Sequence, residues 1–147
     1  MIKASHAGYV LDASAGVKWI KRDELLFDKA IALANKFIRK ACKLVVPELF
    51  FLEAASSIRL NKSFNEQQRS QALSYLWNLN LGLFPMTDTV LLKTNSISHK
   101  YNISIYDASY IALAEITGFP LITADEKLID GMKGNAFILS LKELEFD

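Results

Sequence analysis

The chain has 147 residues, of which 51% are hydrophobic and 22% charged, and its formal net charge is +1. This length predicts a single domain over 1–147, and the apolar content is too high for intrinsic disorder. Cys42 is the only cysteine, which excludes a disulfide scaffold and a cysteine-type zinc site. We see neither the roughly 20 clean apolar residues of a membrane span nor a secretory signal, so we expect a cytoplasmic protein with no membrane contact.

Charge is distributed unevenly along the chain. Residues 1–75 carry 12 Lys and Arg against 7 Asp and Glu, whereas residues 76–147 carry 5 against 9. Such polarity favours an anionic partner, although chance explains the counts equally well.

Apolar runs and helical periods alternate along the whole chain. In chain order we expect a strand at 9–11, a helix from about 13, a helix over 24–42, a strand at 44–46, a helix over 48–60, a helix over 63–78, a strand at 81–84, a helix over 88–100, a helix over 107–118, a strand at 120–123, a helix over 125–132 and a strand at 136–139. Strands that are apolar on both faces and alternate with helices predict a parallel sheet covered on both sides, which is a three-layer α/β/α domain.

Capping residues indicate several helix boundaries. Ser63 with Glu66 three residues later has the pattern of a capping box, and Thr87 is placed to cap the helix over 88–100. Gly118 is a natural residue to end the helix that we expect to start at Asp107.

Aspartates stand at the expected carboxyl ends of the sheet, where ligands bind in open α/β folds. Asp12 directly follows the first strand, Asp125 follows the strand at 120–123, and Asp107 stands at the mouth of a helix. Each of them can also be explained as a helix cap, because Asp is favoured there. The two roles are compatible.

Glu53 cannot be explained as a cap, because it lies inside an apolar helix. A buried carboxylate without a partner costs several kcal/mol or loses its charge. Glu53 therefore pairs with a base such as Arg59 or Lys18, lies on a narrow solvent-facing strip, or shares a site with the three aspartates.

A shared site of four carboxylates has a clear chemical use. Carboxylates gathered without bases repel one another, and a divalent cation removes that penalty. Hard oxygen ligands select Mg²⁺ or Mn²⁺, which can activate water and stabilise charge on a phosphoryl group. The acids thus predict metal-dependent cleavage of a phosphodiester. No Walker-type glycine loop is present, so hydrolysis of nucleoside triphosphates is not expected.

Four segments around these acids resemble the motifs of the PIN-domain nucleases, especially the VapC-like toxins of toxin–antitoxin pairs. In order they are Val10-Leu11-Asp12-Ala13-Ser14, Val46-Pro47-Glu48 leading to Glu53-Ala54-Ala55-Ser56, Ile105-Tyr106-Asp107-Ala108-Ser109-Tyr110, and Leu121-Ile122-Thr123-Ala124-Asp125. The resemblance covers residues 9 to about 139. It implies a twisted parallel sheet, endoribonuclease activity, a homodimer and a small antitoxin that blocks the site.

The resemblance also implies roles for particular residues. Asp12, Glu53 and Asp107 would hold the principal Mg²⁺ or Mn²⁺, and Asp125 would complete the cluster. Supporting hydroxyl positions match Ser14 and Thr123, while Ser56 stands where family members often carry Asn, which puts that polar contact in question. RNA is the expected substrate, cut to 5′-phosphate and 3′-hydroxyl ends. Candidates for contacts to its backbone are Lys18, Lys36, Lys40, Arg59 and Lys62, each of which is also explained as a solvated surface residue.

Three aromatic residues are candidates for contacts to RNA. Trp19, Trp77 and Tyr106 could stack on bases, although core packing is the expectation for each.

Two other functions are compatible with the fold class. One is a catalytically inactive PIN-like scaffold that binds RNA or a protein partner. The other is a phospho-acceptor receiver domain, which fits badly because the strand at 44–46 ends in Pro47 with no Asp.

Overall fold

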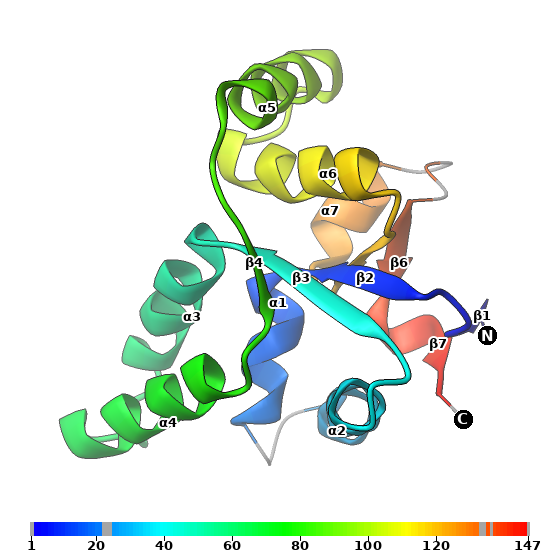
Figure 1. Ribbon diagram of the computed structural model, residues 1–147. Coiled ribbons are helices and arrows are strands. Elements are labelled where there is room, and N and C mark those ends of the chain that lie inside the picture. The colour runs from blue at the N-terminus through cyan, green and yellow to red at the C-terminus, as the bar shows by residue number, and fades with distance from the viewer. Residues whose placement is uncertain (1, 22–24, 133–134, 136, 147) are drawn as a thin grey trace.

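The computed structural model describes residues 2–21, 25–132, 135 and 137–146 (Figure 1). A central sheet of five parallel strands has the order β4-β3-β2-β5-β6. Its strands are β2 (Gly8–Leu11), β3 (Lys43–Pro47), β4 (Gly82–Phe84), β5 (Leu121–Thr123) and β6 (Ile138–Ser140). Because β2 lies in the middle and all four of its residues are buried, the sheet is covered on both faces as the apolar runs predict.

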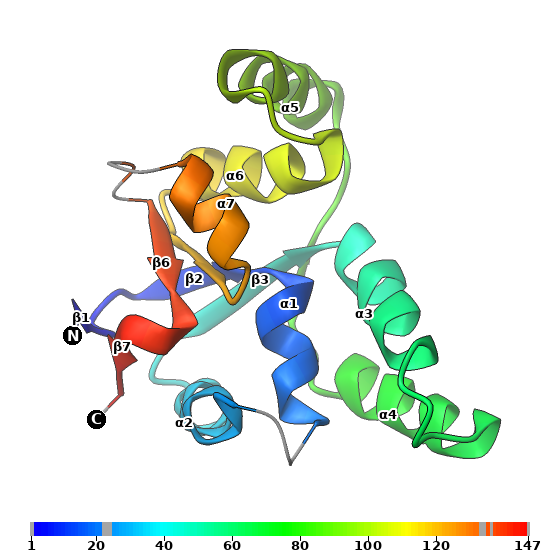
Figure 2. The ribbon, with the colours of Figure 1, turned by 180° about the vertical axis from the view of Figure 1, so that it is seen from behind.

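Helices form the outer layers (Figures 1 and 2). They are α1 (Ala13–Gly16), the 3₁₀ turn η1 (Val17–Trp19), α2 (Phe27–Ile38), α3 (Leu49–Arg59), α4 (Glu66–Asn78), α5 (Asp88–Tyr101), α6 (Ile105–Thr117) and α7 (Glu126–Gly131). α6 and α7 cover one face and α1 and α2 the other, while α5 packs outside α6. The three-layer α/β/α fold is confirmed. None of the described helices is long and apolar enough to cross a membrane.

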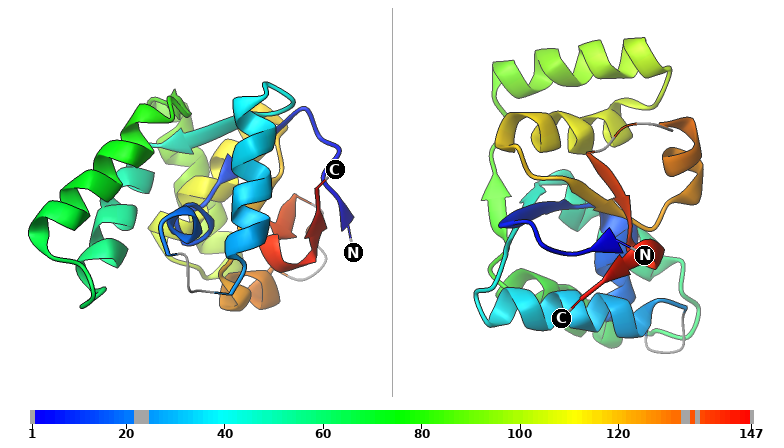
Figure 3. Two further views of the ribbon diagram at one scale, coloured as in Figure 1. Left: turned by 90° about the horizontal axis from the view of Figure 1, so that it is seen from below. Right: turned by 90° about the vertical axis from the view of Figure 1, so that its right-hand side faces the viewer.

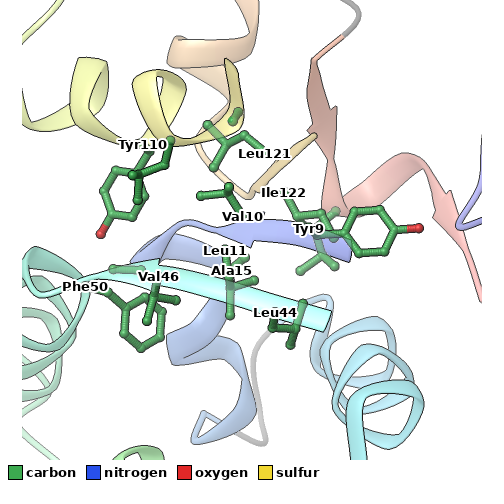
Figure 4. Packing of buried hydrophobic residues seen from close by; sticks show 14 of the residues in the cluster. Tyr9, Val10, Leu11, Ala15, Leu44, Val46, Phe50, Tyr110, Leu121 and Ile122 are labelled. Atoms are coloured by element: carbon green, nitrogen blue, oxygen red, sulfur yellow. The ribbon is translucent and has the colours of Figure 1, made fainter. Parts of the chain in front are cut away.

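The core lies where α1, α3 and α6 meet the sheet (Figure 4). Leu11 and Val46 are fully buried, and the ring of Phe50 enters from α3. α1 approaches α3 closely because Gly16 has no side chain, and a Cβ there would lie 2.6 Å from ring atoms of Phe50. This contact brings the end of β2 close to α3.

Two helix starts differ from the sequence prediction. The capping box of α4 is formed by Asn65 and Gln68, not by Ser63 and Glu66, because the backbone N–H of Ser63 donates to Asn61 Oδ1 in the preceding turn. α6 starts at Ile105 rather than at Asp107. Its cap is a serine that is described with the site below.

Other boundaries agree more closely. Thr87 caps α5, and Gly118 ends α6 with φ of 71°. α2 ends at Ile38, short of the expected 42, and its expected start at 24 lies outside the described residues, as does residue 136 of the last expected strand. The sequence gives no sign of a small parallel sheet between β1 (Ile2–Lys3) and β7 (Leu144–Glu145), which joins the chain ends (Figure 3).

Lysine side chains hold this small sheet to the domain. Lys29 Nζ donates to the carbonyls of Lys142 and Leu144, the second at 2.8 Å, and Lys36 Nζ donates to the carbonyl of Ala4. Lys36 therefore has a structural contact that the RNA-binding hypothesis did not include.

The three aromatic residues have different environments. Trp19 is buried and its indole N–H donates to the carbonyl of Ala30, as expected for core packing. The expectation is wrong for Trp77 and Tyr106, each 61% exposed, since they lie on outward faces of α4 and α6.

Candidate active site

A pocket of about 230 Å³ opens at the carboxyl ends of β2 and β5. Its lining comes from the first residues of α1, the middle of α3 and the starts of α6 and α7. Figure 2 shows these four helices from behind. All four predicted acids lie in the pocket lining, which consists of Asp12, Ala13, Ser14, Val17, Glu53, Ser57, Asp107 and Asp125. Four segments far apart in the sequence thus bring their carboxylates to one pocket.

Asp12 is the most buried of the four acids, with 7% of its surface exposed. Its Oδ2 accepts hydrogen bonds from Ser14 Oγ and Thr123 Oγ1, each 2.7 Å long. Those hydroxyls accept in turn from the backbone N–H groups of Ala124 and Asp125, both at 3.0 Å. Asp12 stands at the N-cap position of α1, and its side chain makes no capping hydrogen bond of regular geometry. The backbone N–H of Ser14 still lies close enough to its carboxylate to lower the pKa of Asp12, so a weak capping contact and a place in the site coexist.

Asp125 does cap a helix. Its Oδ1 accepts from the backbone N–H groups of Lys127 and Leu128, at 3.0 and 3.2 Å. Since this carboxylate also lines the pocket, capping and a place in the site coexist here.

Asp107 lies in the first turn of α6 without being the cap. Ser104 takes that role, because its Oγ accepts from the backbone N–H of Asp107 at 3.0 Å. The carboxylate of Asp107 is therefore not needed for capping and lines the pocket, where the positive end of the helix dipole favours a negative charge.

Glu53 is half-buried and faces the pocket from α3. Its Oε1 accepts a hydrogen bond of 2.7 Å from the hydroxyl of Tyr110 on α6. Figure 4 shows the Tyr110 ring within the core, above Phe50. In the described part of the chain no Lys or Arg forms a salt bridge with Glu53, so the ion pair with Arg59 or Lys18 is not found.

The pocket raises the pKa of three of its carboxyls. Burial is the largest cause for Asp12, Glu53 and Asp107. The charge of Asp12 further raises the pKa of both Glu53 and Asp107, whereas the hydroxyl bonds from Ser14, Thr123 and Tyr110 act in the opposite direction. The charged forms of these acids thus repel one another in a partly dry pocket.

The donor set suits a hard divalent cation. It consists of carboxylate and hydroxyl oxygens, with no Lys or Arg in the lining. No group of three or more His, Cys, Asp or Glu side chains that could hold a metal ion is found among the residues described. In this arrangement the acids line one pocket, but no three of them are placed to hold one ion directly.

The sequence matches the family model described as the PIN domain over residues 9–132. The chain belongs to the PIN-domain family. Ribonuclease VapC1 of Mycobacterium tuberculosis is 30% identical over 122 residues, which cover 81% of this chain and 86% of the relative. The resemblance to VapC-like toxins that the four segments carry is confirmed.

Solved structures share the fold of this PIN domain. PAE2754 from Pyrobaculum aerophilum has a TM-score of 0.67 at 24% identity, over 92% of this chain and 85% of that chain. VapBC2 from Rickettsia felis, bound to a DNA fragment from its promoter, has a TM-score of 0.67 at 12% identity, over 90% and 96%. VapC20 of Mycobacterium tuberculosis, a sarcin–ricin loop cleaving toxin, has a TM-score of 0.65 at 9% identity, over 84% and 95%.

The other predicted site residues of the PIN domain are less central. Ser56 is exposed and is not among the lining residues, whereas its neighbour Ser57 is. Lys18 is half-buried in η1, beside the lining residue Val17. Arg59 and Lys62 are exposed at and beyond the end of α3.

Sequence reasoning missed two residues of the PIN domain that contact the site. Tyr110 lies three residues after Asp107, a spacing that places both on one face of a helix and could have indicated its role. Lys21 Nζ lies 3.5 Å from Ser57 Oγ, which places a cation at the edge of the pocket. No sequence signal separates Lys21 from the other lysines.

Proposed function

We propose that this PIN domain is a divalent-metal-dependent endoribonuclease of the toxin type, which hydrolyses phosphodiester bonds of RNA. The convergence of four carboxylates on one pocket carries the proposal, because that donor set has little other use. The likeness to Ribonuclease VapC1 supports the choice of RNA as substrate.

Asp12, Glu53 and Asp107 would hold the principal Mg²⁺ or Mn²⁺, in part through bound waters, with Asp125 completing the set. When bound, such an ion lowers the pKa of water and stabilises the charge that builds on the phosphoryl group. Ser14 and Thr123 keep Asp12 in place through their hydrogen bonds to its Oδ2. These two hydroxyls would orient Asp12 as a metal ligand, because residues hydrogen-bonded to metal ligands commonly fix their orientation.

Basic residues around the pocket would bind the RNA backbone. Lys18 and Lys21 stand on the η1 side, and Arg59 and Lys62 extend the basic character along the α3 side. Contacts of this kind make binding weaken as salt rises. Attack by water would leave 5′-phosphate and 3′-hydroxyl ends.

Protein partners are part of the proposal. Structures with this fold include a toxin–antitoxin complex from Klebsiella pneumoniae, with a TM-score of 0.60 at 16% identity over 90% of this chain. An antitoxin, a homodimer and action in the cytoplasm are proposed for this chain by analogy. An apolar groove of about 380 Å³ between α3, α5 and α6, with Leu52, Leu91 and Tyr106 exposed along it, suits a protein surface.

A nuclease assay tests the activity. The wild type with Mn²⁺ is expected to cleave a fluorogenic single-stranded RNA, and EDTA or Asp107→Asn is expected to abolish the signal. Asp88→Asn is the matched control, because Asp88 is also in the first turn of a helix but is exposed on α5. An equal signal from the wild type, from Asp107→Asn and with EDTA would show that the pocket does not cleave RNA, and would leave the inactive scaffold as the function.

A further inference from the structure

Tyr110 has an environment unlike that of the other residues around the pocket. It is 1% exposed and its ring belongs to the core beneath α6, so only the hydroxyl reaches the carboxylates (Figure 4). The hydroxyl lies 2.7 Å from Glu53 Oε1, within the range expected for a bond from a neutral hydroxyl to a charged carboxylate oxygen. A tyrosine buried in this way is rigid, and its hydroxyl has a fixed position.

Glu53 needs such a fixed donor. A glutamate side chain on a half-exposed helix face has several rotamers, and holding it in one of them costs conformational entropy. Asp12 and Asp107 both repel its charge and favour rotamers that point away from the pocket. Among the described residues, the bond from Tyr110 is the side-chain hydrogen bond that opposes this repulsion.

The bond also joins two parts of the site. Asp107 and Tyr110 lie on one face of α6, one turn apart, while Glu53 lies on α3. The position of α6 therefore determines where the carboxylate of Asp107 lies and where the Tyr110 hydroxyl that holds Glu53 lies.

We propose that Tyr110 is a positioning residue, whose hydroxyl holds Oε1 of Glu53 and keeps the second carboxylate oxygen of Glu53 available to a metal ion in the pocket. The inference rests on the proposed function for its choice of ligand. Loss of the hydroxyl releases Glu53, and affinity for the metal falls.

Tyr110→Phe tests this inference, because it removes the hydroxyl and keeps the ring. Mn²⁺ binding, followed by the electron paramagnetic resonance of the free ion, is expected to weaken by roughly 10- to 100-fold. Tyr9→Phe is the control, since Tyr9 is also fully buried, but its hydroxyl accepts from His6 N at the opposite end of β2 (Figure 4). Unchanged Mn²⁺ affinity in Tyr110→Phe would overturn the inference.

A second variant separates positioning from a general packing effect. Glu53→Asp shortens the side chain and draws its carboxylate back from the Tyr110 hydroxyl, and we expect a similar loss of Mn²⁺ affinity. If Tyr110 acts through Glu53, adding Tyr110→Phe to Glu53→Asp changes Mn²⁺ affinity no further. A full additional loss in the double variant would contradict the inference.

The outcomes distinguish this inference from the proposed function. A wild type that binds Mn²⁺ but cuts no RNA overturns the nuclease proposal, while the Mn²⁺ titrations still decide the role of Tyr110. A wild type that binds no Mn²⁺ overturns the role of Tyr110 as well.

Discussion

The two sides of the acidic pocket are built differently. On the strand side, Asp12 and Asp125 follow β2 and β5, and their oxygens accept hydrogen bonds from hydroxyls or from the start of a helix. On the helix side, Glu53 and Asp107 project from α3 and α6, and Glu53 is held by one hydroxyl. The strand-side acids therefore stabilise the fold as well as line the site. The helix-side acids bring negative charge into the pocket and contribute little to stability.

The sharpest test compares one acid from each side. Glu53→Gln is expected to lower activity by more than the roughly 100-fold typical of losing a supporting residue at a metal site. Its melting temperature should stay the same or rise, because repulsion from Asp12 and Asp107 is relieved. Asp12→Ala should lose activity and stability together, since it leaves the hydroxyls of Ser14 and Thr123 without their acceptor.

Thermal unfolding by circular dichroism, beside the RNA assay, measures both quantities. A marked loss of stability in Glu53→Gln would contradict the distinction between the two sides. It would indicate that the Glu53 charge is stabilised by a partner, as a buried ion pair would be.

The hydroxyl of Thr123 is the centre of the strand side. It donates to Asp12 Oδ2 and accepts from the backbone N–H of Asp125, and the residue is fully buried. Thr123→Val is expected to lower the free energy of unfolding by about 1–3 kcal/mol, because the backbone N–H of Asp125 loses its acceptor and Asp12 Oδ2 loses one of its two donors. Urea titration measures the loss.

Thr94→Val is the matched control for that change. Thr94 is also buried, but its hydroxyl donates to the carbonyl of Val90 within α5, a bond that contributes little to a helix. Equal losses in the two variants would mean that the network around Asp12 contributes no more than an ordinary buried hydroxyl.

The strands and the four acids could be predicted from the sequence, for related reasons. Short apolar runs mark buried strands, and a carboxylate that follows such a run must stand at the carboxyl edge of the sheet. Glu53 was recognisable because a charge within an apolar helix needs an explanation. The approach of Asp12 to Asp125 follows from the parallel order of the strands, whereas that of Glu53 and Asp107 also depends on how α3 and α6 pack.

The start of α4 and the role of Tyr110 could not be predicted, because the sequence offers more than one equally good interpretation of each. Both Ser63 with Glu66 and Asn65 with Gln68 have capping-box spacing, and the Asn61 side chain decides between them by taking the N–H of Ser63. The side chain of Tyr110 is apolar in its ring and polar at its tip, so the apolar pattern of α6 shows only that it is buried.

The pH dependence of stability is a further test of how the pocket affects its carboxyls. The folded state raises the pKa of Asp12, Glu53 and Asp107, so at pH values between their ordinary and raised pKa it binds more protons than the unfolded chain. The free energy of unfolding of the metal-free protein should therefore fall as pH rises through this window. The fall should be shallower in Glu53→Gln, and comparison of the two proteins cancels the other carboxyls.

Mn²⁺ should counteract this decrease in the free energy of unfolding. At 100 times its dissociation constant a ligand of the folded state adds about 2.7 kcal/mol to the free energy of unfolding. Denaturant titrations from pH 4 to pH 7, with EDTA or Mn²⁺, measure the effect. An identical pH slope in the wild type and Glu53→Gln would show that the folded state does not raise the pKa of Glu53.

The smallest effect is expected at Ser104, which caps α6 in place of Asp107. Ser104→Ala removes the acceptor for the backbone N–H of Asp107 and should cost about 1 kcal/mol of stability. Thr87→Ala, which removes the equivalent cap of α5, should cost about the same. The two variants should differ in activity, with Ser104→Ala slower by roughly two- to tenfold, because fraying of the first turn of α6 displaces Asp107 while α5 carries no residue of the site. Equal RNA cleavage by two equally destabilised variants would indicate that Asp107 keeps its position without the cap, and that the helix side is more rigid than its few hydrogen bonds imply.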